Sequence, residues 1–197
     1  MNGRSKKLRT DEKRREILAS ASAALRKLGV HAVGMRQIAE AAGISAGNLY
    51  YYFRNKDELI YYCQDRTLDE LLEVAERARL EADAREQLGA LIRGHLRITL
   101  GHAAGPLHLE FGDLPPPLLK KVVKKRDRYE QKVRDLIADA QRRRELRPGS
   151  PKQDAFLLLG ALNWASRWYQ PNRGWGVDAL ADHHCDRILD GLMYRRS

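Results

Sequence analysis

The sequence has little cysteine and no apolar run long enough to cross a membrane. Its two cysteines, Cys63 and Cys185, are far apart in the sequence, which excludes a small fold held together by disulfides and indicates reduced thiols in a cytoplasm. The charge-free apolar stretch Ala155–Ser166 has 12 residues, well short of the roughly 20 that span a bilayer. The basic N-terminus runs on into Asp11 and Glu12 without an apolar signal core. We therefore expect a cytoplasmic protein with no membrane partner.

Patterns typical of catalysis and metal binding are also missing. The sequence has no Glu-x-x-His pair of a di-iron bundle, no glycine-rich phosphate loop and no nucleophile elbow. His183, His184 and Cys185 look like metal ligands, but adjacent helical residues diverge by about 100 degrees and cannot all reach one ion. The sequence predicts no catalytic residue, no metal site and no cofactor, so an enzyme built on the C-terminal helices has no support.

Positive charge is plentiful and unevenly distributed. The 197 residues include 36 Lys and Arg against 26 Asp and Glu, which gives a net charge of +10 and indicates a polyanionic partner. The net charge is +6 over residues 1–60, −4 over 61–114, +7 over 115–149 and +1 over 150–197. A basic N-terminal unit is thus followed by an acidic stretch and then by a second basic segment.

Apolar residues recur at helical spacing almost throughout, which predicts an all-α protein. The expected helices cover residues 10–28, 35–42, 46–52, 56–80, 84–102, 115–144, 151–169 and 177–194. The helix of residues 155–169 is apolar nearly all round, which places it at the centre of the fold or between subunits. The last helix carries one apolar stripe, so the two could pair and dock on a symmetric copy.

Residues 35–52 have the length pattern of a helix-turn-helix. A short helix ends at Gly43, and a second one starts after Ser45, whose hydroxyl suits an N-cap. The small core of this unit would consist of Ile38, Ala39, Ile44, Leu49 and Phe53. The simpler alternative is an ordinary pair of short helices in an all-α domain.

The second helix of such a unit lies in the major groove of DNA. The small residues Ala46 and Gly47 let its backbone approach the duplex closely. Asn48 can reach base edges or phosphate, and Tyr50 and Tyr51 offer hydroxyls to phosphate oxygens.

The run from Ile38 to Leu59, IAEAAGISAGNLYYYFRNKDEL, resembles the signature of TetR-family transcriptional regulators. With the first helix, the resemblance covers roughly residues 10–60. It implies a homodimer that binds a palindromic double-stranded operator and a C-terminal helical domain for dimerisation and small-molecule binding. The implied divisions are a flexible basic arm (1–9), a three-helix helix-turn-helix domain (10–55) and the ligand-binding domain (56–197). The implied DNA-contacting residues are Arg36, Ser45, Gly47, Asn48, Tyr50, Tyr51 and Lys56.

Two positions depart from the common family pattern. Gly34 stands where many relatives have Ser or Thr, which predicts a weaker helix cap without a hydroxyl for phosphate. Ala46 stands where many have Lys or Arg, which removes one electrostatic contact. The basic tail between Arg4 and Arg9 could compensate by lying along phosphates or in a minor groove.

The stretch from Gly160 to Pro171 resembles the penultimate helix of family members that regulate lipid or steroid breakdown and respond to acyl-coenzyme A thioesters. Such a ligand needs an apolar tunnel and cations for its phosphates. Leu158 and Leu162 could line the tunnel with two tryptophans, and Arg167 and the basic run 120–128 could bind the phosphates. The candidate ligand-binding residues are His95, His102, Trp164, Arg167 and Trp168.

Each of these ligand assignments has a simpler alternative. Trp164 and Trp168 could be interface core, the basic run a solvated helix face, and the histidines ordinary core or surface residues. The sequence as a whole predicts a homodimeric repressor that a small-molecule effector releases from its operator. The rival interpretation is a helical small-molecule-binding protein with no regulatory role on DNA.

Overall fold

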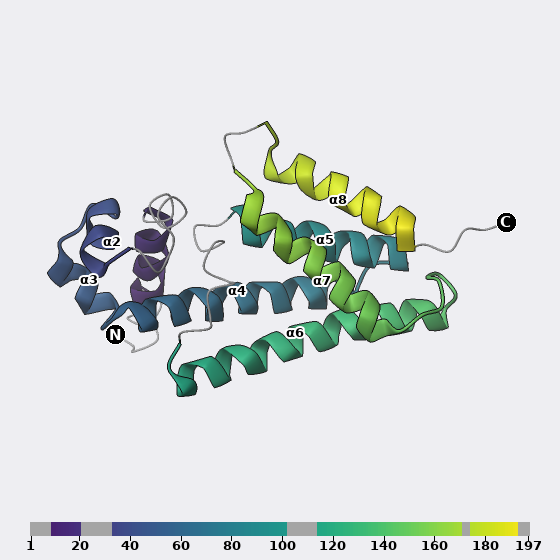
Figure 1. Ribbon diagram of the computed structural model, residues 1–197, viewed down its shortest axis with the longest axis horizontal. Helices are drawn as coiled ribbons and strands as arrows, with labels where there is room; N and C mark the ends of the chain where they lie inside the picture. Colours follow the sequence, from purple (N-terminus) through teal and green to yellow (C-terminus); the bar gives the residue numbers. More distant parts are fainter. Residues whose placement is uncertain (1–8, 21–32, 102–113, 171–173, 193–197) are drawn as a thin grey trace.

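A computed structural model describes residues 9–20, 33–101, 114–170 and 174–192, and every regular element in these ranges is a helix (Figure 1). The all-α prediction is therefore confirmed. After a first helix (residues 9–20), the helices are α2 (Met35–Ala41), α3 (Ala46–Tyr52), α4 (Lys56–Ala78), α5 (Ala84–Gly101), α6 (Pro116–Arg142), α7 (Pro151–Trp168) and α8 (Val177–Leu192).

The predicted helix ends agree with the observed ends to within about two residues wherever the structure describes both. Local signals explain this agreement, since Asn55 and Ser150 accept hydrogen bonds from the backbone at the starts of α4 and α7. Arg9, which we had assigned to a flexible arm, already lies in the first helix. The predicted helical residues 21–28 and 193–194 lie outside the described ranges.

Helix α4 connects the two ends of the molecule. Its first turns lie against the first helix beside α2 and α3, and the rest runs between α5 and α6 into the C-terminal bundle (Figure 1). Its buried face is mostly apolar, from Leu59 through Cys63 and Leu71 to Ala78, and includes the polar residues Gln64 and Thr67. Helix α4 is therefore packed against both the bundle and the helix-turn-helix end.

The approach of α5 to α4 depends on a glycine. A Cβ built at Gly94 would lie 2.5 Å from Cγ1 of Val74 on α4, and no real Cβ tolerates such a contact. Because valine is branched at Cβ, it has few other rotamers with which to move away. Gly94 therefore sets the spacing between the two helices.

We expect Gly94→Ala to destabilise the protein by about 1–3 kcal/mol, the usual cost of overpacking, despite the better helix propensity of alanine. The matched control is Gly191→Ala, since a Cβ at Gly191 meets nothing within 4 Å. Urea denaturation of both variants measures the difference. Equal stability of the two variants would contradict the assignment of Gly94 as the spacing residue.

Helix α8 is held along α5 by three ion pairs in antiparallel order. Arg85 pairs with Asp190 at 2.8 Å, Arg93 with Asp182 at 2.7 Å, and Arg97 with Asp178 at 2.6 Å. These exposed pairs contribute little energy each, but they fix the register of α8.

Among the described helices, none is long and apolar enough to cross a bilayer.

Helix α7 presents a buried stripe and an exposed stripe on different sides. Ala155, Leu158, Leu162 and Ala165 are buried against the bundle, and Leu157, Trp164 and Trp168 are exposed on another side. Trp168 stacks on His184 of α8, with ring centroids 6.2 Å apart. The exposed aromatic stripe of α7 thus continues onto α8.

Candidate functional site

The turn between α2 and α3 has the hydrogen bonds of a glycine-stopped helix. The backbone N–H of Ile44 donates to the carbonyl of Ala39, and that of Gly43 donates to Glu40, both at 3.0 Å. Gly43 has φ +65°, a conformation that glycine adopts without strain. The turn therefore needs glycine at this position, and it redirects the chain into α3.

Both short helices begin with a hydrogen bond between the backbone and a side chain. Ser45 Oγ accepts a hydrogen bond from the Asn48 N–H at 3.1 Å, so this serine is the N-cap of α3 as expected. At the start of α2, Gln37 Oε1 accepts from the Gly34 N–H at 2.8 Å. The missing hydroxyl at Gly34 is thus partly offset by Gln37, which reaches back one turn.

Most of the residues predicted to contact DNA lie on the open surface of this unit. Tyr50 is 49% exposed and Tyr51 is 73% exposed, whereas Leu49 between the two short helices is fully buried. A side chain at Gly47 would meet nothing within 4 Å, so the backbone there is open to approach. Arg36, Ser45 and Asn48 are also exposed, and Lys56 is half-buried at the start of α4.

Arg14 of the first helix fixes α3 in place. Its guanidinium donates to the carbonyl of Tyr52 at 2.7 and 3.0 Å and to Glu58 at 3.2 Å. It also lies over the rings of Phe53 and Tyr62, at 5.1 and 5.4 Å from their centroids. This role could not be predicted from the sequence, because Arg14 is one of several arginines in a basic segment.

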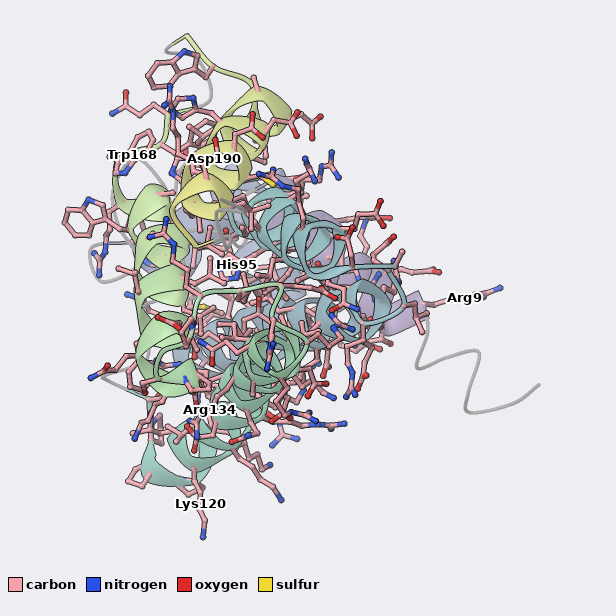
Figure 2. The ribbon with its side chains drawn as sticks, turned by 90° about the vertical axis from the view of Figure 1, so that its right-hand side faces the viewer. Arg9, His95, Lys120, Arg134, Trp168 and Asp190 are labelled. Atoms are coloured by element: carbon pink, nitrogen blue, oxygen red, sulfur yellow. The ribbon has the colours of Figure 1, made fainter. Side chains whose placement is uncertain are left out.

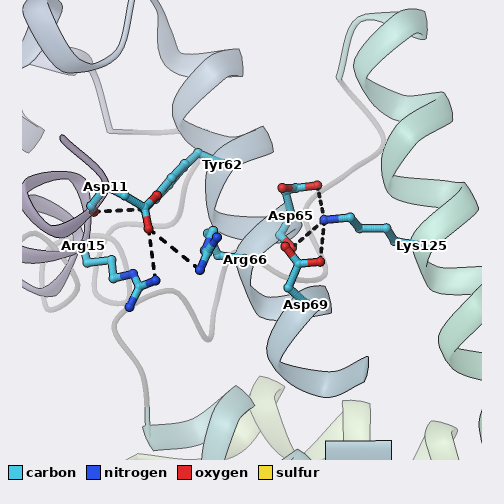
Figure 3. A network of polar contacts seen from close by, with 7 residues as sticks. All are labelled: Asp11, Arg15, Tyr62, Asp65, Arg66, Asp69 and Lys125. Carbon is cyan, nitrogen blue, oxygen red and sulfur yellow. Dashed lines mark hydrogen bonds and ion pairs between the residues drawn. The ribbon is translucent and has the colours of Figure 1, made fainter. Parts of the chain in front are cut away.

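A polar network joins the first helix to α4 (Figure 3). The Tyr62 hydroxyl donates to Asp11 Oδ1 at 2.7 Å, and Arg15 donates to Asp11 at 3.0 Å. Burial alone would raise the pKa of Asp11. The hydrogen bond from Tyr62 and the charges of Arg66 and Arg15 outweigh it, so the pKa of Asp11 is lowered.

Because this pKa is depressed in the folded state, the stabilisation by Asp11 is present above its unfolded value of about 3.9 and is lost as pH falls through the folded pKa. We expect Asp11→Asn to cost about 0.5–1 kcal/mol at pH 7, after allowance for solvent screening, and clearly less near pH 3. Urea denaturation at the two pH values measures the change. Glu73→Gln, an exposed carboxylate paired with Arg77, is the control. A cost of Asp11→Asn that is equal at both pH values would contradict a lowered pKa of Asp11 in the folded state.

The opposite side of α4 is bound to α6. Lys125 Nζ lies 2.6 Å from Asp65 and 2.7 Å from Asp69, as Figure 3 shows, and Lys132 pairs with Glu76. Lys125 belongs to the basic run that we had considered either a solvated face or a phosphate anchor. For this lysine the structure shows a third role, an ion pair between helices.

A cavity of about 400 Å³ opens between α6 and α7 and reaches inward to α4 and α5. Its outer rim includes the exposed residues Arg126, Asp127 and Phe156. Its inner end includes His95 and Tyr129, whose Nδ1 and hydroxyl oxygen are 3.0 Å apart. The remaining lining residues are Thr67, Leu68, Leu71, Glu130, Leu159, Gly160 and Asn163.

The structure brings one of the five candidate ligand-binding residues, His95, into this cavity. Trp164, Arg167 and Trp168 lie outside its lining, because α7 faces the cavity with the stripe at positions 156, 159, 160 and 163. His102 lies outside the described residues. Sequence reasoning missed Tyr129 and Thr67, although each interrupts an apolar helix face with a hydroxyl.

An exposed recognition helix, joined through α4 to a bundle with an internal cavity, defines a ligand-responsive class of DNA-binding protein. Residues 17–63 match the family described as bacterial regulatory proteins, tetR family. Residues 81–192 match the tetracyclin repressor-like C-terminal domain. The chain belongs to the TetR family, and the predicted function of DNA-binding transcriptional regulator is confirmed.

Individual relatives resemble the chain over most of its length. The transcriptional repressor KstR2 of Rhodococcus jostii is 27% identical, and the alignment covers 91% of each chain. The structure of KstR2 of Mycobacterium tuberculosis has a TM-score of 0.81 at 21% identity, over 93% of this chain and 96% of that one. AibR, solved with isovaleryl coenzyme A and operator DNA, has a TM-score of 0.74 at 23% identity, over 88% and 96%. At these identities the two structures show a shared fold.

Proposed function

We propose that this chain is a cytoplasmic, homodimeric repressor that leaves its operator when an acyl-coenzyme A thioester binds in the cavity between α4, α5, α6 and α7. The observation that carries the proposal is the double role of α4. This helix lines the cavity with Thr67, Leu68 and Leu71, and it holds the first helix through Tyr62. A ligand that displaces α4 therefore changes the position of the DNA-binding domain.

The chemistry of the cavity supports a thioester. Leu68, Leu71 and Leu159 in its walls suit an acyl group, whereas its rim carries Arg126. Lys120, Lys121 and Lys124 are exposed on the same helix, within two turns of Arg126, where they could bind the phosphates of coenzyme A. The relatives named above include repressors and a structure that contains an acyl-coenzyme A.

For the DNA side, the proposed division is residues 10–55 for DNA binding and 56–197 for ligand binding and dimerisation. The proposed contacts are Arg36, Ser45, Gly47, Asn48, Tyr50, Tyr51 and Lys56. Selection of genomic DNA fragments by the purified protein tests whether the chain binds DNA in a sequence-specific way. We expect an inverted repeat whose half-sites lie about one helical turn apart, or a multiple of it. Binding that is indifferent to sequence and strongly weakened by salt would contradict it.

We further propose that the dimer forms through α7 and α8. Support comes from the exposed stripe of Leu157, Trp164 and Trp168, which a monomer would leave in water. We expect Trp164→Glu to yield monomers and to weaken operator binding, because one subunit reads only one half-site. Sedimentation velocity measures the change, with Leu80→Glu, at an exposed position near the end of α4, as the control. A Trp164→Glu protein that remains dimeric would exclude this interface.

A further inference from the structure

This inference rests on the proposed effector function and concerns the contact that ligand binding must work against. We infer that Lys125 of α6 is a positioning residue, which holds α4 against α6 through Asp65 and Asp69 and so opposes entry of the effector. These three residues are called the α4–α6 clamp below. Removing the lysine would make the effector bind more tightly.

Helices α4 and α6 pack against each other and run in the same direction (Figure 1). Three lysines of α6, four and seven positions apart, each meet a side chain on one face of α4. The contacts are Lys121 with the Tyr61 ring, Lys125 with Asp65 and Asp69, and Lys132 with Glu76. Lys120, in contrast, points away from the bundle (Figure 2). Part of the basic segment 115–149 thus faces the acidic stretch before it.

Lys125 is the central contact of this series. Its Nζ lies 2.6 Å from Asp65 and 2.7 Å from Asp69, and it also donates to the backbone carbonyl of Asp65 at 3.3 Å. The side chains of Lys125 and Asp65 are 28% and 23% exposed, whereas those of the surface pair Arg97 and Asp178 are 55% and 74% exposed. Because solvent screens partly buried charges less, the clamp contributes more to the position of its helix than an exposed pair does.

The clamp lies beside the wall of the cavity. Thr67, Leu68 and Leu71 line the cavity from α4, each within two positions of an aspartate of the clamp. Arg126, the residue after Lys125, lines it from α6. A ligand that enters between α6 and α7 and reaches α4 therefore presses on both helices where the clamp joins them. Separation of the two helices lengthens the ion pairs, so the clamp opposes it.

Linkage between the two equilibria determines the direction of the effect. The clamp favours the position of α4 in which the ion pairs are short, and the effector favours the position in which they are long. Weakening the clamp populates the second position and so lowers the apparent Kd of the effector. A general charge effect has the opposite sign, because loss of a lysine weakens attraction for the phosphates of coenzyme A. Tighter binding thus distinguishes the clamp from a charge effect.

The test measures thioester binding to the full-length protein. Isothermal titration calorimetry gives the Kd of acetyl-CoA, octanoyl-CoA and dodecanoyl-CoA for wild type, Lys125→Met, Asp69→Asn and the double variant. The matched control is Arg77→Met, which removes a cation that pairs with Glu73 within α4. Thermal melts verify that each variant is folded. If Lys125→Met does not fold, Asp69→Asn decides the outcome.

We expect Lys125→Met to lower the Kd of the thioesters that bind wild type by about fivefold, at the low end of usual allosteric couplings. Asp69→Asn should lower it by about threefold, because Asp65 still pairs with Lys125. In the Lys125→Met protein, Asp69→Asn should have no further effect, since both substitutions break the same contact. Arg77→Met should bind as wild type.

A Kd equal to or above that of wild type in either folded single variant would overturn the inference and leave the effector proposal standing. An equal gain in Arg77→Met would also overturn it, because the effect would then not come from the contact between α4 and α6. If none of the three thioesters binds wild type, the effector proposal fails and the inference falls with it.

Discussion

Replacing Tyr51 with alanine is expected to weaken operator binding by about 10- to 100-fold, since a direct contact with DNA contributes about 1–3 kcal/mol. Tyr51 is the most exposed aromatic residue of α3 and packs edge-on against Tyr52, with ring centroids 5.1 Å apart. Its removal leaves the core around Leu49 and Phe53 intact, so the variant should remain folded. Fluorescence anisotropy with a labelled operator fragment measures the loss.

Two companion variants define what Tyr51 contributes. Tyr51→Phe keeps the ring and removes the hydroxyl, so it isolates the proposed hydrogen bond to phosphate. Lys56→Ala should lower the slope of log affinity against log salt by about one unit, whereas Lys124→Ala on α6 should leave it unchanged. Unchanged affinity of Tyr51→Ala for a specific operator would exclude the assigned contacts of α3.

Filling the cavity is expected to give a repressor that no longer responds to its effector. Leu159 lines the cavity from α7 and is only partly buried, so a larger side chain can occupy the space without displacing the core. We expect Leu159→Trp to weaken thioester binding at least about tenfold, which corresponds to about 1.4 kcal/mol. Operator affinity without ligand should stay within about twofold of wild type, because Leu159 lies far from α3.

The matched control for this variant is Leu80→Trp, the same substitution at a position that is 85% exposed at the end of α4. Operator release is measured by titrating the protein–DNA complex with thioester for all three proteins. Leu80→Trp should behave as wild type. If Leu159→Trp is released as easily as wild type, the ligand binds outside this cavity.

The helix-turn-helix could be predicted from the sequence because its determinants are local. Gly43 must adopt a positive φ, Ser45 must cap the next helix, and Leu49 must face inward, and each requirement lies within a few residues of chain. The same logic predicted a poor cap at Gly34. It overlooked Gln37, whose side chain bonds back to the Gly34 N–H. Even in this missed contact, the two residues are only three positions apart in the sequence.

The cavity could not be predicted in the same way, because four helices build it. Helix α7 is apolar nearly all round, so its sequence alone does not distinguish the stripe facing the core from that facing the cavity or the surface. The motif resemblance drew attention to Trp164 and Trp168, whereas the cavity uses Phe156 and Leu159 on a neighbouring stripe. His95 was chosen because it lies seven residues from His102 on one helical face, in the region where the family resemblance implies a ligand pocket. Its partner Tyr129, 34 residues away, required the fold.

The measurement that tests the account most directly is release of the selected operator by acyl-coenzyme A thioesters. The protein–operator complex is titrated with a series from acetyl-CoA to dodecanoyl-CoA, with free coenzyme A and the free acids as controls, at two salt concentrations. We predict that thioesters of a limited size range release the operator at both salt concentrations and that neither control does so. Retention of the operator at saturating concentrations of every thioester would contradict the account.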